Sequence, residues 1–364
     1  MYSDKKICLI IPVLVAGGME RVMSELSGYF CRKRDKEIHL VMYGVKQEIF
    51  YPLPPNLIIH RPDWKFDNKK RKWHTFKRMI YLRQTVKKIQ PNTILSFGEY
   101  WNSFVLFSLM GLKYPIFVSD RCQPDKRLGF IQDHLRKWLY PKATGIIAQT
   151  DIAKAIYLKH FRHSNIRVIG NPIRRIETNS KNRDRENIVL TVGRIIKSKN
   201  FDLLIDIFIK IGKPEWKLII VGGDAIQQNG TERLAAKIKE LHAEDQVILT
   251  GNISNVEGYY LKSKIFAFTS SSEGFPNVIG EAMSAGIPVV AFDCVAGPAE
   301  MIEDGVNGFL VPLFDAEKFE QQLALLMSDE SQRISMGVDA QKSIEKFSAE
   351  SVGAAFYSFI MQQN

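Results

Sequence analysis

The feature that most limits the fold of this chain is a repeated alternation of short apolar runs with longer amphipathic segments. Segments 20–30 and 73–89 have the helical period, and the second has an apolar stripe. That stripe consists of Phe76, Met79, Leu82, Val86 and Ile89. The first half of the chain also contains apolar runs that indicate buried strands, at residues 7–13, 37–43, 93–97, 115–119 and 145–149. Strands that alternate with helices form parallel sheets, so this half predicts a doubly wound α/β domain.

The same pattern restarts after residues 171–187, a polar and charged segment that we interpret as an interdomain linker. Helices are predicted at 201–211 and 231–241. Strands are predicted at residues 188–192, 216–221, 247–250, 265–269, 289–292 and 309–311. The chain therefore predicts two Rossmann-like, doubly wound α/β domains that face a central cleft.

The predicted domains are an N-terminal one, residues 1–170, and a C-terminal one, residues 171–347. Segment 349–361 is amphipathic and no strand follows it. We expect the C-terminal helix, within residues 348–364, to cross back to the first domain.

Composition argues against several classes of protein. The best candidate for a membrane-spanning helix, residues 104–112, ends at Lys113 and is too short to span a membrane. Pro12 interrupts the apolar run near the start, which favours a buried strand over a signal peptide. The 4 cysteines are scattered, so neither a disulfide framework nor a zinc site is predicted, and a reducing cytoplasm is expected.

The charge of the chain is uneven. The net charge is +11, but residues 1–170 carry 30 Lys and Arg against 13 Asp and Glu, whereas the remainder is acidic. A basic cluster of Lys69, Lys70, Arg71 and Lys72 stands near Trp73. Such a run is usually the solvated side of a helix, but it also suits an anionic lipid surface. Nucleic acid is a poorer match, because no recognition fold or aromatic RNA-binding motif is present.

The segment EGFPNVIGE, residues 273–281, places two acids around a predicted helix start that follows an apolar strand. Pro276 suits the first turn of a helix, and we expect free N–H groups near Asn277 and Val278 to attract an anion. The loop and helical turns between Glu273 and Glu281 separate them by roughly 8–12 Å. That distance is larger than the distance between the two catalytic carboxyl groups of a retaining glycosidase. It suits two acids that hold opposite ends of one ligand, such as a sugar nucleotide. The alternative is that Glu273 only caps a loop and that Glu281 is a solvated residue of the helix.

Two other strand ends carry groups that suit phosphate. The segment VGRIIKSKN, residues 192–200, contains Arg194 and Lys199, which together would neutralise a diphosphate, although loop cations are usually solvated. Gly17 and Gly18 lie between the first strand and the first helix, where glycine lets a backbone approach a phosphate. Tight turns often use glycine for structural reasons alone, and no G-x-G-x-x-G fingerprint is present.

These motifs resemble glycosyltransferase family 4, a family of retaining enzymes with the two-domain GT-B fold. EGFPNVIGE is similar to its E-x₇-E element, VGRIIKSKN to its Arg/Lys pair and Gly17-Gly18 to its N-terminal donor loop. Residues 281–312 look typical of bacterial members that build surface polysaccharides.

The resemblance implies a role for each matching position. Glu281 would hold the ribose, Glu273 the hexose hydroxyls, and Arg194 with Lys199 the diphosphate. Residues lining the sugar and phosphate pocket would be Phe275, Pro276, Asn277 and Val278, and the loop that ends at Val256 would read the nucleobase.

One position departs from the family pattern. Many relatives carry a histidine after the strand at 115–119, where this chain has Ser119-Asp120-Arg121. Asp120 or Arg121 would take its catalytic place, or the two would form a pair that only holds the loop. No D-x-D motif occurs, so we expect metal-independent transfer with no cofactor, in which Arg194, Lys199 and the helix dipole take the place of a cation.

The predicted function is transfer of a hexose or N-acetylhexosamine from a nucleotide sugar, preferably a UDP-sugar, with retention of configuration. The expected acceptor is a glycan or a polyprenyl-diphosphate-linked glycan for O-antigen or capsule, bound at the cytoplasmic face of the inner membrane. A nucleotide-sugar epimerase or hydrolase of the same fold stays open and would turn over UDP-sugar without an acceptor. A non-enzymatic membrane- or nucleic-acid-binding protein also stays open and would show salt-sensitive binding without nucleotide affinity.

Overall fold

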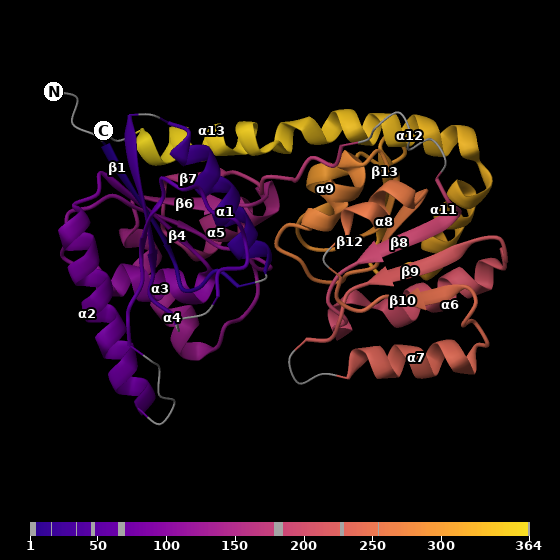
Figure 1. Cartoon of the computed structure of the whole chain (residues 1–364), viewed down its shortest axis with the longest axis horizontal. Helices are drawn as coiled ribbons and strands as arrows, with labels where there is room; N and C mark the ends of the chain where they lie inside the picture. The colour runs from indigo at the N-terminus through magenta and orange to yellow at the C-terminus, as the bar shows by residue number, and fades with distance from the viewer. Residues whose placement is uncertain are drawn as a thin grey trace. The chain divides into compact units, whose positions relative to one another are not determined.

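A computed structural model of the chain describes residues 5–15, 17–33, 35–44, 48–64, 70–177, 185–225, 229–253 and 255–362. The chain divides into two compact units: unit 1, Met1–Pro172 with Ala349–Asn364, and unit 2, Ile173–Ser348. Each unit contains a parallel sheet with helices packed on it (Figure 1). The predicted fold class, two doubly wound α/β units, is confirmed. The cleft that we expect between the domains stays a prediction.

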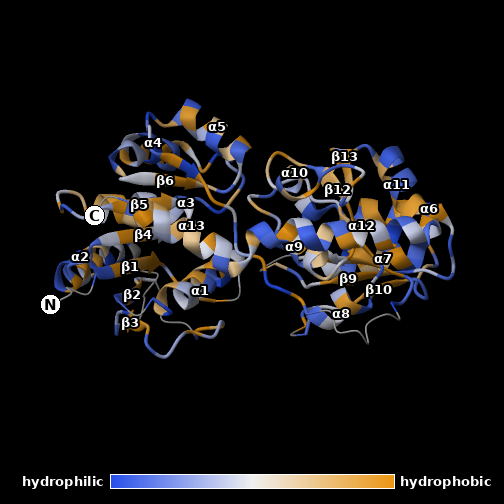
Figure 2. Ribbon diagram, turned by 90° about the horizontal axis from the view of Figure 1, so that it is seen from above, coloured by the Kyte–Doolittle hydropathy of each residue, from blue (hydrophilic) through white to orange (hydrophobic). Residues whose placement is uncertain are grey.

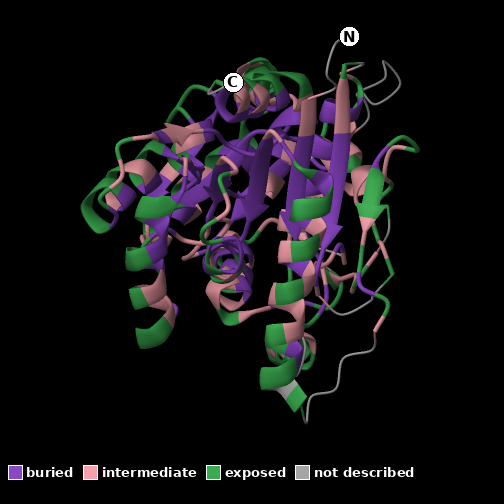
Figure 3. Ribbon diagram, turned by 90° about the vertical axis from the view of Figure 1, so that its left-hand side faces the viewer, coloured by how far each residue is buried: buried purple, intermediate pink, exposed green. Residues whose placement is uncertain are grey.

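Unit 1 has a 7-stranded sheet in the order β3-β2-β1-β4-β5-β6-β7. Its elements in chain order are β1 (Lys5–Ile11), α1 (Gly18–Cys31), β2 (Lys36–Met42), β3 (Ile58–His60), α2 (Arg71–Ile89), β4 (Thr93–Phe97), α3 (Glu99–Ser108), β5 (Ile116–Ser119), α4 (Phe130–Leu139), η2 (Tyr140–Lys142), β6 (Gly145–Ala148), α5 (Asp151–His160), β7 (Ile166–Val168) and finally α13 (Ala349–Met361). The central strands are buried, while the outer faces of the helices are exposed (Figure 3).

Unit 2 has a 6-stranded sheet in the order β10-β9-β8-β11-β12-β13. Its elements are β8 (Ile188–Val192), η3 (Lys197–Lys199), α6 (Phe201–Ile211), β9 (Lys217–Val221), α7 (Gly230–Glu240), β10 (Val247–Leu249), α8 (Glu257–Lys262), β11 (Ile265–Phe268), α9 (Asn277–Ser284), β12 (Val289–Asp293), α10 (Pro298–Met301), β13 (Gly308–Pro312), α11 (Ala316–Ser328), α12 (Glu330–Ser343) and η4 (Ile344–Phe347).

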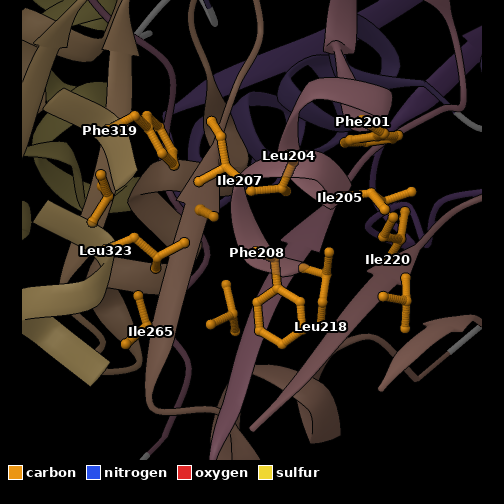
Figure 4. Close-up of a cluster of buried hydrophobic side chains, with 14 of the residues drawn as sticks. Phe201, Leu204, Ile205, Ile207, Phe208, Leu218, Ile220, Ile265, Phe319 and Leu323 are labelled. Atoms are coloured by element: carbon orange, nitrogen blue, oxygen red, sulfur yellow. The ribbon is translucent and has the colours of Figure 1, made fainter. Parts of the chain in front are cut away.

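The core of unit 2 follows directly from the apolar stripes of its helices. Phe201, Leu204 and Phe208 of α6 share one face, and this face packs against Leu218 and Ile220 of β9 (Figure 4). Residues three and four apart lie on the same side of a helix, whereas alternate residues of a strand face the same side of a sheet. The apolar face of α6 therefore packs on the apolar face of the sheet and forms the core of unit 2.

The start of the predicted linker is packed and is not a free connection. Ile173 and Ile176 are buried in unit 2, and the Ile173 N–H donates to the Phe347 carbonyl at 2.7 Å. The Ile176 N–H donates to Ser284 Oγ at 3.0 Å. The boundary between the units falls between Pro172 and Ile173, and residues 178–184 lie outside the described part of the chain.

The last helix, α13, packs against α1 and β4 of unit 1. Phe356 contacts Phe97 at a ring distance of 6.0 Å, and Phe359 contacts Phe117 at 5.1 Å. Orange residues alternate with pale and blue ones along this helix, which matches its amphipathic sequence (Figure 2).

The stripe predicted for α2 is only partly buried. Leu82, Val86 and Ile89 are buried, but Phe76 is 52% exposed because the first turns of α2 extend beyond the sheet (Figure 3). Within the described residues, no helix has both the length and the apolar character needed to cross a membrane.

Candidate functional site

The candidate site lies at the carboxyl ends of the strands at the centre of unit 2. β8 pairs with β9 on one side and with β11 on the other, so the chain leaves β8 and β11 toward opposite edges of the sheet. In open α/β sheets ligands bind at such a switch point. The loop after β8 carries Arg194 and Lys199, and the loop after β11 carries Glu273.

Hydrogen bonds tie these two loops together. Thr269 Oγ1 donates to the Lys199 carbonyl at 2.8 Å, and Asn200 Nδ2 donates to the Thr269 carbonyl at 2.8 Å. The Ser271 N–H donates to the Ser198 carbonyl at 2.8 Å. These three hydrogen bonds hold the loop after β8 in a fixed position relative to the loop after β11.

The tied loops bring two predicted site residues into contact. Lys199 Nζ lies 2.5 Å from Glu273 Oε1, and their side chains are 15% and 18% exposed. The structure thus joins the cation of one motif to the first acid of the other, although they are 74 positions apart. A half-buried ion pair is less screened by solvent than a surface pair.

Arg194, the other predicted cation, lies at the start of the same loop and is exposed. Among the described residues it forms no ion pair. The loop beneath it is held by the Ile195 N–H, which donates to the Gly223 carbonyl at 2.9 Å. Gly222 has a φ of +146°, and a Cβ there would collide with the Gly193 carbonyl, so this close approach requires glycine.

The helix after Glu273 starts one residue later than the sequence predicts. α9 begins at Asn277, and Pro276 precedes it, so Pro276 does not occupy the first helical position. The Asn277 N–H is also not free, because it donates to the Phe275 carbonyl at 3.0 Å. Phe275 itself is buried against Phe347 at a ring distance of 5.3 Å. Asn277 and Val278 are half-buried at the start of the helix.

The second acid of the predicted pair has a partner that the sequence did not indicate. Tyr260 of α8 donates its hydroxyl to Glu281 Oε2 at 3.0 Å, and the Tyr260 ring stacks on Phe266 of β11 at 5.9 Å. Val256, the predicted nucleobase residue, directly precedes α8 and packs against the same core. Nothing in the sequence separates Tyr260 from the adjacent Tyr259, because only the fold shows which ring turns inward. The predicted spacing between the two carboxylates stays a prediction.

Cys294, which follows β12, is a further neighbour of this site. Burial raises the pKa of its thiol to about 12, and the negative charge of Glu273 acts in the same direction. The thiol is therefore protonated at neutral pH. A protonated thiol is a poor nucleophile.

In unit 1 the predicted glycine loop is filled by the protein's own side chains. α1 begins at Gly18, and a Cβ at Gly17 would collide with the Glu20 carboxylate. Tyr51 contacts both backbone groups of Gly17: its hydroxyl donates to the Gly17 carbonyl at 2.9 Å and accepts from the N–H at 3.2 Å. The bonds to Tyr51 use backbone groups of Gly17 that any residue has, and the Glu20 carboxylate ends a flexible side chain, so these contacts alone do not require glycine. Its role in donor binding stays a prediction.

Asp120 lies in a buried network, and its predicted catalytic role stays a prediction. It is 1% exposed, and its carboxylate accepts hydrogen bonds from Asn102 Nδ2 at 3.1 Å and the Tyr140 hydroxyl at 2.5 Å. It also pairs with Arg136 of α4. Asp120 therefore pairs with Arg136 and not with Arg121, which corrects the alternative that an Asp120–Arg121 pair holds the loop.

The Arg121 guanidinium lies over the Phe97 ring at 3.8 Å. One of its N–H groups bonds Asn171 Oδ1, whereas Nε and Nη2 have no hydrogen-bond partner among the described residues. Burial lowers the pKa of this guanidinium to about 9, against the opposing charge of Asp120. Asp120 and Arg121 are both candidates to replace the histidine of the family pattern. Of the two, Arg121 has N–H groups that could still bind a ligand.

The basic cluster can be described only in part. Lys69 lies outside the described residues, and nothing is described of the Arg71 side chain. Lys70 and Lys72 are exposed at the start of α2, and Trp73 next to them is 61% exposed. A basic surface with an exposed indole is therefore present, but its partner stays a prediction.

Comparison with known proteins identifies the family on both units. Residues 16–175 match Glycosyltransferase Family 4, and residues 173–343 match Glycosyl transferases group 1. The chain is 30% identical over 341 residues to the amylovoran biosynthesis glycosyltransferase AmsD of Erwinia amylovora, covering 90% of this chain and 92% of AmsD.

A second relative comes from Campylobacter jejuni, the GalNAc-α-(1→4)-GalNAc-α-(1→3)-diNAcBac-PP-undecaprenol α-1,4-N-acetyl-D-galactosaminyltransferase. It is 25% identical over 351 residues, which are 94% of each chain. Among solved structures, Anabaena HepE in complex with UDP-glucose has a TM-score of 0.80 and 18% identity, covering 98% of this chain and 99% of HepE. These matches confirm the predicted resemblance and the predicted enzyme class: the chain belongs to glycosyltransferase family 4 and is a hexosyltransferase.

Proposed function

We propose that this enzyme transfers a hexose or N-acetylhexosamine from a UDP-sugar, with retention of configuration, to a glycan or polyprenyl-diphosphate-linked glycan. The product would be a surface polysaccharide such as O-antigen or capsule. The names of the AmsD and C. jejuni relatives support this acceptor class, and the UDP-glucose complex of HepE supports the donor.

The observation that carries the proposal is the contact between Lys199 and Glu273 at the switch point, with Nζ and Oε1 at 2.5 Å. An ammonium group has three N–H donors, so Lys199 can keep Glu273 in place while it also binds a diphosphate oxygen. Glu273 is left with lone pairs for the hydroxyls of the sugar. Lys199 would thus bind the diphosphate and Glu273 the hexose. The ion pair between them would position these two groups on opposite sides of the sugar–phosphate bond that breaks.

Charge then develops on the leaving diphosphate as the sugar–phosphate bond breaks. Arg194 and Lys199 would stabilise that charge, and fixed donors in a half-buried site act without reorganisation. We propose that no metal ion is required, because these two cations supply the neutralisation. At the other end of the donor, Glu281 would accept the ribose hydroxyls while Tyr260 holds its second oxygen.

Unit 1 would bind the acceptor, and its basic face would place the enzyme on the cytoplasmic side of an anionic membrane. The exposed Lys70, Lys72 and Trp73 support this role. Each basic residue near an anionic surface contributes about 1 kcal/mol to membrane binding.

The main test measures UDP release from a panel of UDP- and GDP-sugars, with and without a lipid-linked glycan acceptor. We expect Lys199→Ala to lower kcat about 100-fold, the usual effect of removing one donor to a developing anion. Lys197→Ala is the matched control, since Lys197 is exposed in the same 3-10 turn. Equal rates for the two variants would refute the diphosphate role.

The same assay separates the rival activities. A transferase releases UDP rapidly only when the acceptor is present, whereas a hydrolase releases it without the acceptor. An epimerase releases no net UDP and converts the UDP-sugar into its epimer, which NMR of the nucleotide sugar detects. NMR of the product tests retention: UDP-N-acetylhexosamines are α-linked, so an α-glycosidic product means retention and a β product contradicts it. An undiminished rate in EDTA is expected, and loss of activity that Mg²⁺ restores would overturn the metal-independent step.

Vesicle flotation tests the basic face. Charge reversal at Lys69, Lys70, Arg71 and Lys72 should weaken binding to anionic vesicles strongly. Binding that does not change would exclude this surface as the membrane contact.

A further inference from the structure

A second binding cavity lies entirely within unit 1. It has a volume of about 580 Å³ and is lined by the loop before α4, by α4 itself and by the end of α5. We call it the α4 pocket. The two helices are neighbours in Figure 2, and Tyr140, which follows α4, contacts Phe161, which follows α5, at a ring distance of 4.7 Å. Its basic lining residues are Lys126, Arg127, His134, Arg136, Lys137 and His160.

The lining of the pocket has a net positive charge, because Lys126, Arg127, Arg136 and Lys137 outnumber Asp125 and Asp133. Asp125 Oδ1 accepts from Gln123 Nε2 at 2.6 Å, and Asp133 Oδ1 accepts from the Leu128 N–H at 3.1 Å. Lys126, Arg127 and Lys137 are exposed, and none of them forms an ion pair within the described part of the chain. Cations that are not neutralised by the protein favour an anionic ligand.

Arg136 adds a buried, incompletely satisfied cation to the pocket wall. The residue is only 6% exposed, and its guanidinium pairs with Asp120 through one terminal nitrogen. Its Nε has no hydrogen-bond partner among the described residues, although a buried N–H without a partner is unfavourable. A planar fork of N–H donors suits the oxygens of a phosphate.

The start of α4 provides further donors. Gly129 precedes the helix with a φ of +99°, and no side chain caps the helix N-terminus. The 10-residue helix therefore presents uncapped N–H groups and the positive end of its dipole at the pocket. At the rim, the Phe130 ring lies 4.1 Å from the His134 ring, and Phe130 and Ile131 are 78% and 73% exposed.

We propose that the α4 pocket binds the phosphate group of a phosphate ester or diphosphate ester, separately from the nucleotide-sugar donor. The ligand would contact the start of α4, the terminal groups of Lys126, Arg127 and Lys137, and the guanidinium of Arg136. The same chemistry is present in a soluble phosphate ester and in the headgroup of a phospholipid. The exposed Phe130 and Ile131 at the rim would contact apolar chains only in the second case.

Calorimetric titration with inorganic pyrophosphate tests the pocket. Arg194→Ala and Lys199→Ala are introduced first, so that the donor site cannot contribute to binding. In that background, Lys126→Glu with Lys137→Glu should weaken pyrophosphate affinity about tenfold or more, equivalent to about 1.4 kcal/mol. Lys87→Glu with Lys88→Glu makes the same change of charge on exposed positions of α2, a helix that α3 separates from α4.

The source of the phosphate is distinguished with a second variant, Phe130→Ser with Ile131→Ser. Flotation is measured in a background in which Lys69, Lys70, Arg71 and Lys72 are replaced by Glu, so that this basic cluster cannot hold the protein on an anionic vesicle. If the ligand is soluble, the Phe130/Ile131 variant keeps its pyrophosphate affinity, and the pocket variants float with phosphatidylcholine vesicles that contain phosphatidic acid to the same extent as this parent. If the ligand is a headgroup, the parent of this background floats with those vesicles but not with pure phosphatidylcholine, and both pocket variants lose flotation.

Two results would overturn the proposal. One is equal pyrophosphate affinity in the Lys126/Lys137 and the Lys87/Lys88 variants, which would mean that net charge alone attracts the anion. The other is competition by a hexaglutamate peptide as strong as that by pyrophosphate, which would assign the pocket to acidic peptides. Because Lys199 is already replaced, failure here leaves the donor-site proposal untouched.

Discussion

The two carboxylates of the proposed donor site are held by different kinds of partner. Glu273 pairs with the charged Lys199, whereas Glu281 accepts a hydrogen bond from the neutral Tyr260. A charged partner can also bind the leaving group and so contribute to the chemistry. A neutral hydroxyl mainly orients the group, so the loss of each partner should have a different kinetic effect.

Replacing Tyr260 by Phe should weaken donor binding without slowing the chemical step. The variant keeps the ring that stacks on Phe266 and loses only the hydroxyl, so Glu281 becomes less well oriented. We expect KM for the donor to rise several-fold with kcat nearly unchanged, since one hydrogen bond contributes about 0.5–1.5 kcal/mol. Steady-state kinetics with Tyr259→Phe as the neighbouring control checks this. A fall in kcat at unchanged KM would show that Tyr260 acts at the reacting bond instead.

Replacing Asp120 by Asn should destabilise unit 1 and not only lower activity. The substitution removes the charge that compensates Arg136, which is 6% exposed. Breaking a buried pair in this way costs about 3–5 kcal/mol in the free energy of unfolding. Urea denaturation gives this value, and Asp125→Asn in the exposed loop is the control. If the variant kept full stability but lost turnover, the result would support a catalytic role for Asp120 instead.

At the scale of single elements, the sequence predicted the buried strands well, because β8 and β11 read as uninterrupted apolar runs. It did not predict β3, a three-residue edge strand with two exposed isoleucines. Nor did it predict α4, because Phe130, Ile131 and Trp138 are exposed and blur the apolar stripe. The positions of Arg194 and Lys199 at a strand end followed from the sequence. Their contact with Glu273 did not, because it depends on which strands are neighbours.

The pairing of β2 with β3 should make unit 1 sensitive to acid. His39 Nδ1 and His60 Nε2 lie 2.9 Å apart, an arrangement that needs one nitrogen without a proton. Burial lowers the pKa of His39 against the opposing effect of Glu37, with Lys6 lowering it further. Burial also lowers the pKa of His60, with smaller contributions from the charges of His39 and Lys88.

Because both folded-state pKa values lie below the unfolded value of about 6.5, their contribution to stability is complete above that pH. It is lost as the pH falls through the folded-state values. We expect the Tm of unit 1 to fall as the pH is lowered below about 6.5, and to fall less in a variant with His39→Gln and His60→Gln. Differential scanning calorimetry across this range, with the exposed His134→Gln as control, measures the effect. An identical slope in the two variants would contradict it.

At the scale of the whole molecule, unit 1 is discontinuous in sequence. It is closed by α13, which follows all of unit 2 in the chain. The amphipathic pattern of residues 349–361 predicts a helix, but a period of 3.6 says nothing about which sheet receives its apolar face. The structure shows that the helix packs on unit 1. A Cβ at Gly353 would collide with the Tyr29 ring, so α13 approaches α1 at a position that only glycine allows. The first 172 residues are thus an incomplete unit without the end of the chain.

Truncating Phe356 of α13 should therefore destabilise strands that lie more than 230 positions earlier in the sequence. Phe356 is fully buried and contacts Phe97 of β4, so Phe356→Ala should cost about 3–5 kcal/mol in the free energy of unfolding of unit 1. Amide hydrogen exchange reads the two units separately. We expect lost protection in β1, β4 and β5 with β8 and β11 unchanged, because those strands belong to the other unit. Ser358→Ala on the exposed face of the same helix is the control. Equal loss of protection in both sheets would mean that the chain unfolds as one cooperative body and that α13 stabilises more than unit 1.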